Sequence, residues 1–367
     1  MQVEPAQAPV SAPFSGSYHP NDVTFLLRPV ALAPTDVGEK ERLIRAGRHY
    51  SEMIAPEHPP EDTYLALYRA ALQRNGARLA RDVATLAARI AGRAKGREIV
   101  LASLARAGTP IGVLLLRTLR AQGHRVAHYS LSIIRDRGID LAALGHIATR
   151  HDPADVVFVD GWTGKGAIAA ELERSLAARP FGFAPVLAVI ADPAGHASLA
   201  AGFDDYLIPS GLLNAIVSGL VSRSILSAET VAPGQFHACV FYSHLAGHDL
   251  SRDFVETIAR LAAAARPAPP CESSSDRTAA RAACAALMAA VMRELRVGDP
   301  NRIKPGIAEA TRALLRRVPD RLLLRDAGDP DVRHLVHLAA KVDVPIGSLP
   351  PSSHFRAVAV IDGGGDR

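Results

Sequence analysis

Apolar residues in the middle of the chain gather in short runs that alternate with helical patterns. The runs are EIVLASL (98–104), RVAHYSLSII (125–134), DVVFVDG (155–161) and PVLAVIAD (185–192). Between them, helical spacing covers 110–122, 139–149 and 165–178. This order is typical of parallel strands joined by crossover helices, and continuous apolar runs fit strands covered on both faces. The pattern predicts an α/β fold built on a doubly wound parallel sheet.

Helical patterns flank this middle region. Apolar residues recur at helical spacing over 39–53 and 62–93, whereas Pro, Ala and Ser replace any periodicity in AAARPAPPCESSSDRT. The predicted units are a mostly helical N-terminal extension (1–94), a core (95–262), a linker (263–278) and a C-terminal α/β cap (279–367).

Composition narrows the class of protein. The chain has 367 residues, of which 48% are hydrophobic, and no apolar run approaches the roughly 20 residues that a membrane-spanning helix needs. The start, MQVEPAQAPVSAPF, lacks the pattern of a signal peptide, so we expect a cytoplasmic protein without a membrane partner. The net charge of +5 favours an anionic small substrate over nucleic acid, because acids are interspersed and aromatic residues are only 5%. The sequence leaves open whether the protein forms a homo-oligomer.

The strongest local signal is VVFVDGWTGKGAIAAEL, a buried strand followed by a carboxylate, a Gly-rich turn and a helix. The first turn of a helix offers free N–H groups to a phosphate. Gly164 and Gly166 would let the backbone approach such a group, Thr163 and Lys165 would bind it, and Asp160 would accept hydrogen bonds from sugar hydroxyls. The sequence does not fit the P-loop pattern GxxxxGK[ST]. The alternative is an ordinary strand-to-helix turn.

A second loop follows the strand before it, in SLARAGTPIG. Arg106, Ala107, Gly108 and Thr109 are positioned to cradle a pyrophosphate through backbone N–H groups and a guanidinium. The alternative is a simple helix cap by Thr109.

Between these loops, in SIIRDRGID (132–140), Arg135, Asp136 and Arg137 interrupt an apolar strand. A charged, Gly-containing loop there would close over a triphosphate-like ligand and exclude water. A solvated turn is the alternative. Asp192, at the end of the next strand, is a candidate for holding a metal or a base, although a plain turn explains it equally well.

Long motifs spread over residues 14–361 carry a family resemblance. They are FSGSYHPNDVTFLL, HYSEM, SLARAGTPIG, HYSLSIIRDRGID, FVDGWTGKGAI, DDYLIPSGLLNAIVSGLVSRS and NRIKPGIAEATRALLRRVP. Together they resemble the StiP family, whose members belong to bacterial tellurium-resistance and stress gene clusters. Members are described as phosphoribosyltransferase-like, and they are also labelled cysteine proteases. The resemblance implies a core of type I phosphoribosyltransferase type.

The resemblance also implies a site. Thr163 to Gly166 would surround the 5-phosphate of phosphoribosyl pyrophosphate (PRPP), and Arg106 to Gly108 would hold its pyrophosphate. Asp160 would contact the ribose and Mg²⁺, while arginines such as Arg106, Arg135 and Arg137 would neutralise the leaving group. Ordinary phosphoribosyltransferases carry two adjacent acids before this loop, whereas here Asp160 stands alone.

In such a transferase the acceptor pocket would use the small polar residues of DDYLIPSGLLNAIVSGLVSRS. The candidates are Asn214, Ser218 and Arg223, with helix packing as the alternative. Lys304 and Arg312 would reach the anionic ligand, while Arg316 and Arg317 have the pattern of a solvated helix face.

A thiol protease needs a cysteine activated by a nearby histidine. The chain has Cys239, Cys271 and Cys284, and Cys239 stands two residues from His237. Neighbouring residues on a strand do not make an aligned pair, and a buried cysteine without a chemical role is the alternative.

The leading hypothesis is that the protein transfers a phosphoribosyl group or binds a phosphorylated ribose. The reaction would contribute to the synthesis of a nucleoside-like metabolite in tellurium resistance or stress response. A non-catalytic nucleotide-sensing regulator and a cysteine protease are the alternatives. The acceptor is not indicated by the sequence.

Overall fold

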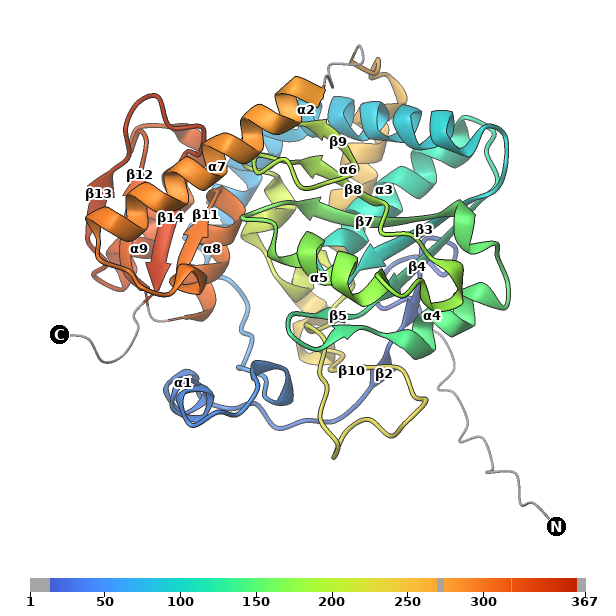
Figure 1. Cartoon of the computed structure of the whole chain (residues 1–367), viewed down its shortest axis with the longest axis horizontal. Helices are drawn as coiled ribbons and strands as arrows, with labels where there is room; N and C mark the ends of the chain where they lie inside the picture. The colour runs from blue at the N-terminus through green and yellow to red at the C-terminus, as the bar shows by residue number, and fades with distance from the viewer. Residues whose placement is uncertain (1–13, 269–273, 318, 362–367) are drawn as a thin grey trace.

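A six-stranded parallel sheet forms the centre of the protein in the computed structural model, which describes residues 14–268, 274–317 and 319–361 (Figure 1). Its order is β1-β4-β3-β7-β8-β9. The strands are β1 (Thr24–Leu26), β3 (Ile99–Leu104), β4 (Val126–Leu131), β7 (Val156–Trp162), β8 (Leu187–Ala191) and β9 (Leu199–Gly202). Neighbouring strands pair in parallel throughout. The predicted α/β fold with a parallel sheet is confirmed.

Helices cover both faces of this sheet, as alternation along each strand requires. Leu101 and Val157 face a cluster shared with α2 (Asp62–Ala94), α3 (Gly108–Ala121) and α6 (Ser251–Ala263). Val100 and Phe158 face the opposite cluster, shared with α4 (Leu141–Ala148) and α5 (Ala167–Leu176). Burial on both faces explains why these strands are apolar without a break.

The segment before α2 is less helical than its pattern predicts. It supplies β1 at one edge of the sheet, where Phe25 and Leu26 are fully buried. It continues through β2 (Arg28–Pro29), α1 (Val37–Arg45) and the short 3-10 turn η1 (Tyr50–Glu52). In Figure 1, α1 lies beneath the C-terminal unit, and residues of both α1 and η1 line the cavity described below.

Short elements connect the main ones. A small hairpin, β5 (Ile133–Ile134) and β6 (Gly138–Ile139), carries the charged loop 135–137. Strand β10 (Ala238–Cys239) pairs in parallel with β2. The 3-10 turns are η2 (Pro153–Asp155), η3 (Pro180–Gly182), η4 (Pro209–Leu212), η5 (Ala215–Val217) and η6 (Ser243–His248).

The chain ends in a second α/β unit with its own apolar cluster. Its sheet has the order β11-β14-β12-β13, in which β12 and β13 are parallel and β14 is antiparallel to both neighbours. Its elements are α7 (Ser274–Glu294), η7 (Pro300–Arg302), β11 (Ile303–Pro305), α8 (Ile307–Arg316), β12 (Pro319–Leu324), η8 (Pro330–Val332), α9 (Arg333–Lys341), β13 (Ile346–Ser348) and β14 (Ala357–Ile361). Cys271, in the predicted linker, lies outside the described residues. The predicted domain boundaries stay predictions.

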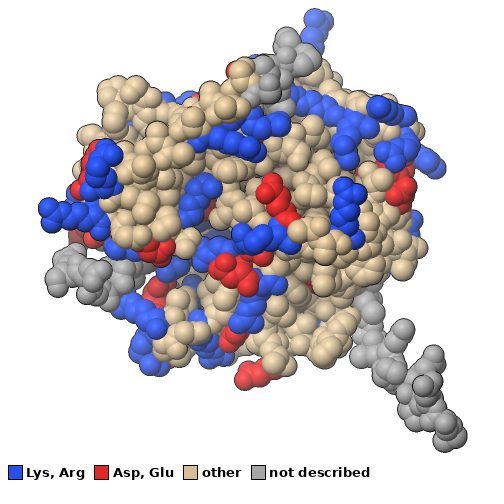
Figure 2. Space-filling model, viewed as in Figure 1, with Lys and Arg blue, Asp and Glu red and all other residues tan. Residues whose placement is uncertain are grey.

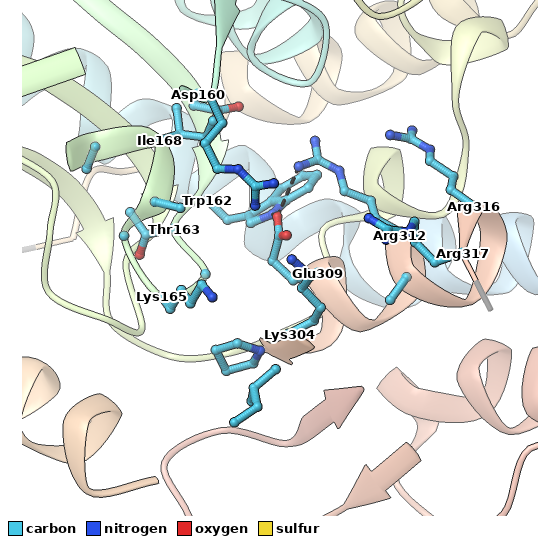
Figure 3. A pocket seen from close by; sticks show the side chains of 18 of the residues that line it. Asp160, Trp162, Thr163, Lys165, Ile168, Lys304, Glu309, Arg312, Arg316 and Arg317 are labelled. Carbon is cyan, nitrogen blue, oxygen red and sulfur yellow. Dashed lines mark hydrogen bonds and ion pairs between the residues drawn. The ribbon is translucent and has the colours of Figure 1, made fainter. Parts of the chain in front are cut away.

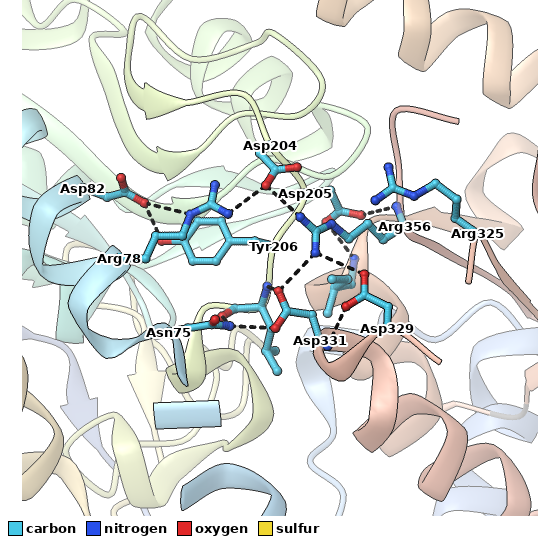
Figure 4. Close-up of polar contacts among 12 residues, drawn as sticks. Asn75, Arg78, Asp82, Asp204, Asp205, Tyr206, Arg325, Asp329, Asp331 and Arg356 are labelled. Atoms are coloured by element: carbon cyan, nitrogen blue, oxygen red, sulfur yellow. Dashed lines mark hydrogen bonds and ion pairs between the residues drawn. The ribbon is translucent and has the colours of Figure 1, made fainter. Parts of the chain in front are cut away.

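A polar network joins this unit to the core (Figure 4). The Asp331 carboxylate accepts hydrogen bonds from Arg74, Asn75 and the N–H of Leu207 at 2.8–3.2 Å. Buried Asp205 accepts from the N–H of Ile307, at the start of α8, at 3.0 Å. These contacts fix α8 against the central sheet. Among the residues described, no helix combines the length and apolarity that crossing a membrane requires.

Candidate functional site

A cavity of about 270 Å³ lies between the carboxyl end of β7, the hairpin loop, α1 and the C-terminal unit (Figure 3). On the face shown in Figure 2, Lys and Arg side chains gather around the hollow between the core and this unit. The charged residues that line the cavity are Lys40, Arg135, Lys165, Arg223, Lys304, Arg312, Arg316, Arg317, Asp160 and Glu309. Eight cations against two acids give the cavity a positive potential, which favours an anionic ligand.

The Gly-rich loop between β7 and α5 forms one wall. Gly166 has a φ of +83°, and a Cβ there would lie 2.4 Å from the His196 ring, so the position requires glycine. Thr163 Oγ1 donates to Asp192 Oδ1 at 2.5 Å. The Asp192 carboxylate also accepts from the N–H groups of His196 and Ala197, each at 2.9 Å. Asp192 is fully buried behind the loop, so it positions the loop and does not line the cavity.

Lys165 links the loop to the C-terminal unit. Its Nζ donates to the carbonyl of Pro300 at 2.5 Å and lies 3.3 Å from Asn301 Oδ1. Burial lowers the pKa of Lys165, and the nearby charge of Arg135 lowers it further. The predicted phosphate-loop residues therefore lie together at the cavity, as the spacing of the motif indicates.

Asp160 lies on β7 at the cavity wall. Its Oδ1 accepts from the N–H of Gly161 at 2.8 Å, and burial raises its pKa to about 6 although Arg312 opposes the shift. Within the described residues no other side chain forms a hydrogen bond or ion pair with this carboxyl. It is therefore free to contact a ligand.

Helix α8 supplies much of the remaining charge. Glu309 pairs with Arg312 at 3.0 Å and accepts from the indole Nε1 of Trp162 at 3.3 Å. Burial alone would raise the pKa of Glu309, but Arg312 and Lys304 lower it overall. Burial lowers the pKa of Lys304 to about 8. Lys304 lies at the cavity, as predicted.

The prediction that Arg316 and Arg317 form a solvated face is wrong. Both line the cavity, where Arg316 donates to Asn214 Oδ1 and Arg317 pairs with Glu41 at 2.8 Å. The helix packs against the central unit, so its cationic face is turned inward. For α8, the spacing of residues 309, 312 and 316 on one helix face was the signal in the sequence that could have shown this. Lys40 of α1 also lines the cavity, and the sequence analysis did not identify it.

The second predicted loop lies beside the cavity rather than in it. Arg106 pairs with Glu57 and donates to the carbonyl of Val221, both at 3.0 Å. It borders a space of about 20 Å³ together with Ala107, Asn214 and Ser218. The peptide between Ala105 and Arg106 is cis.

Two neighbours of this loop serve packing. A Cβ on Gly108 would lie 2.2 Å from the carbonyl oxygen of Val159, so glycine lets α3 approach β7. Thr109 is fully buried, and its hydroxyl hydrogen-bonds to that of Ser130 at 2.8 Å. Ala107 is the N-cap of α3 and no side chain caps the helix, so the alternative of a Thr109 cap is wrong.

Of the remaining predicted arginines, Arg135 and Arg223 line the cavity and Arg137 does not. Arg135 lines the cavity, and its N–H donates to the Tyr50 hydroxyl at 3.0 Å. Arg137 instead pairs with Glu52 at 2.5 Å and is not part of the cavity lining. Arg223 lines the cavity and donates to the carbonyls of Tyr50 and Met53.

The two described cysteines are buried. Burial raises the pKa of Cys239 to about 12 and that of Cys284 to about 11. His237 hydrogen-bonds to Ser132 Oγ at 2.7 Å rather than to a thiol. Neither thiol has the exposure and lowered pKa that a nucleophile needs. The described ranges contain no group of three or more His, Cys, Asp or Glu side chains suited to a metal ion.

Comparisons with known proteins cover both units. Residues 16–259 match the family described as tellurite-like stress resistance cysteine protease StiP, and residues 282–363 match the PELOTA RNA binding domain. A protein of Acinetobacter baylyi named cysteine protease StiP is 44% identical over 361 residues, which cover 95% of this chain and 94% of that protein.

Solved structures give weaker matches. The hypoxanthine phosphoribosyltransferase of Trypanosoma cruzi aligns with 35% of this chain and 80% of its own, at 16% identity and a TM-score of 0.28. The HGPRT-ase of Leishmania tarentolae, in complex with GMP, aligns with 44% of this chain and 91% of its own, at 15% identity and a TM-score of 0.29. Structural matches this weak do not assign residues of the site. The matches along the sequence are decisive: the chain belongs to the StiP family.

Proposed function

We propose that the cavity binds a phosphorylated ribose, PRPP in particular, and that the protein transfers the phosphoribosyl group to an acceptor. The observation that carries the proposal is the loop from Thr163 to Gly166, which starts α5 at a cavity lined by eight cations and two acids. N–H groups at a helix start bind phosphate, and the surrounding cations favour a ligand with several negative charges. A core of phosphoribosyltransferase type is part of this proposal.

The lining residues suit the roles that the transfer needs. The 5-phosphate would bind at the loop, and Asp160 would accept a hydrogen bond from a ribose hydroxyl. The bond between ribose C1 and the pyrophosphate oxygen breaks, and pyrophosphate leaves with the electron pair. C1 then bonds to a nucleophilic atom of the acceptor, which loses a proton. Arg312 and the other cations of the cavity lining would neutralise the charge that develops on the leaving group.

Mg²⁺ fits this site through one protein ligand. Asp160 offers a carboxylate oxygen without a side-chain partner among the described residues, and Mg²⁺ commonly binds one or two carboxylates together with substrate phosphates and waters. When bound, the ion would neutralise charge on the pyrophosphate.

The test is release of pyrophosphate from PRPP, measured with a panel of nucleobases and other nitrogen nucleophiles. We expect turnover with at least one acceptor and a loss of 100-fold or more in Arg312→Met, on the order of the effect of removing one preorganised charge. Binding of PRPP without turnover by any acceptor would favour the nucleotide-sensing regulator instead. Hydrolysis of peptide substrates would favour the cysteine protease activity that the names of the relatives indicate.

RNA is a second candidate ligand. The match of residues 282–363 to an RNA-binding family favours it, and Lys304, Arg312 and Arg316 of this stretch line the cavity. Fluorescence anisotropy with a labelled structured RNA would test it. Binding that PRPP displaces would place RNA at the same cavity, and absence of binding at 100 mM salt would remove this candidate.

A further inference from the structure

Three cations meet at the end of the cavity away from the Gly-rich loop. They are Lys40 of α1, Arg223 of the segment after η5, and Arg316 of α8, and we call them the distal cation cluster. Figure 3 shows Arg316 on the opposite side of the view from Thr163 and Lys165. Lys40 lies close enough to both arginines for their charges to act on it, and Arg223 acts on Arg316 in the same way. Segments far apart in sequence thus bring like charges together.

None of these three side chains forms an ion pair with a carboxylate of the described residues. Of the two nearby acids, Glu41 pairs with Arg317 at 2.8 Å and Glu57 pairs with Arg106 at 3.0 Å. The cluster has hydrogen bonds only to neutral acceptors: the carbonyls of Tyr50 and Met53 for Arg223, and the Asn214 amide for Arg316.

One atom of the cluster has no partner at all. Arg223 Nη1 is buried and forms no hydrogen bond within the described part of the chain. Lys40 is only 6% exposed. A buried cation without a counter-ion is costly, and an unsatisfied buried donor adds to that cost. Burial, and next the charge of Arg223, lower the pKa of Lys40 to about 8, although Glu41 opposes the shift. Burial, and next the charges of Arg106 and Arg312, lower the pKa of Arg316 to about 9, although Glu57 opposes the shift. An anion placed here would remove both costs.

We propose that the distal cation cluster binds a second anionic group, so that the ligand of this cavity carries phosphate or pyrophosphate at two separate ends. The inference rests on the proposed function for the first end, at the Gly-rich loop. It assigns the pyrophosphate of PRPP to this cluster rather than to Arg106, which lies near Arg316 but whose guanidinium is occupied by Glu57 and the Val221 carbonyl. Residues of the N-terminal segment and of the C-terminal unit thereby become part of the ligand site.

Calorimetric titration with inorganic pyrophosphate tests the cluster without any ribose. The proteins are the wild type, Lys40→Met, Arg316→Met and the control Arg45→Met, which removes an exposed cation from the same helix as Lys40. We expect about tenfold weaker binding or more in both cluster variants and an unchanged Kd in Arg45→Met, since a charge-assisted contact is worth roughly one factor of ten. Equal binding by all four proteins, or none by the wild type at millimolar pyrophosphate, would overturn the proposal.

A second pair of titrations separates this inference from the proposed function. PRPP should bind the wild type more tightly than ribose 5-phosphate, and Lys40→Met should weaken only PRPP binding. An equal loss for both ligands would overturn the assignment of the second anionic group to this cluster. If pyrophosphate binds at the cluster but neither ribose ligand binds, the cluster stands as an anion site and the proposed function fails.

Discussion

Glu309 accepts a hydrogen bond from the indole N–H of Trp162 at 3.3 Å and pairs with Arg312 at 3.0 Å. Trp162 ends β7 of the central sheet, whereas Glu309 lies on α8 of the C-terminal unit, and the Arg312 guanidinium lies 4.6 Å from the Trp162 ring centroid. The two units therefore meet at the cavity. The C-terminal unit completes the site and does not merely follow it in the chain.

This contact makes a prediction about affinity. Glu309→Gln keeps the shape of the side chain and removes one of the two acids in the cavity lining, so the positive potential rises. We expect PRPP to bind severalfold more tightly, measured by calorimetry. If the variant bound tenfold more weakly, Glu309 would itself contact the ligand.

The Gly-rich loop makes a prediction about stability. Gly166→Ala introduces a Cβ at a φ of +83° and 2.4 Å from the His196 ring, so it should lower the free energy of unfolding by about 1–3 kcal/mol. Gly92→Ala is the matched control, because nothing lies within 4 Å of its Cβ on α2, and it should be stabilising. Urea unfolding of both variants measures the difference. Equal stabilities would show that the loop tolerates a side chain.

Asp160 makes a prediction about pH. Its pKa in the folded protein is about 6, against an ordinary value of 3.8, so the folded state holds a proton more tightly than the unfolded state. Ionisation of Asp160 therefore destabilises the ligand-free fold as pH rises from about 4 to 6. Asp160→Asn should have a Tm close to that of the wild type at pH 4 and a higher one at pH 7. Parallel Tm profiles would contradict a raised pKa.

The cysteines make a prediction about reactivity. Because burial raises the pKa of Cys239 and Cys284, iodoacetamide at pH 8 should label both thiols slowly in the folded protein and rapidly in urea. Peptide mapping by mass spectrometry reads each site separately. Rapid labelling of Cys239 in the folded state would revive the thiol-protease hypothesis.

The central strands were predictable because burial on both faces leaves an unbroken apolar run. EIVLASL at 98–104 forms β3 (Ile99–Leu104), and DVVFVDG at 155–161 lies within one residue of β7 (Val156–Trp162). The Gly-rich loop was predictable for a related reason, since a strand end, glycines and a helix start are adjacent in sequence. Local order alone places those residues at one edge of the sheet.

The far side of the cavity was not predictable in this way. Lys40 and Arg316 are brought together by the packing of α1 and α8 around the central sheet, and no local pattern records that meeting. The prediction that Arg106 contacts the ligand was misleading for a different reason. Its position in the loop fits a ligand contact, but Glu57, distant in sequence, occupies its guanidinium. Side chains that depend on long-range partners need the structure.

Binding of PRPP at the Gly-rich loop can be measured by calorimetric titration of the wild type, Gly166→Ala and Arg45→Met. We expect PRPP to bind the wild type and Arg45→Met, and to bind Gly166→Ala at least tenfold more weakly, because the altered loop can no longer present its N–H groups to the 5-phosphate. Equal affinity in all three proteins, or no binding by the wild type, would contradict the claim that this cavity holds a phosphorylated ribose.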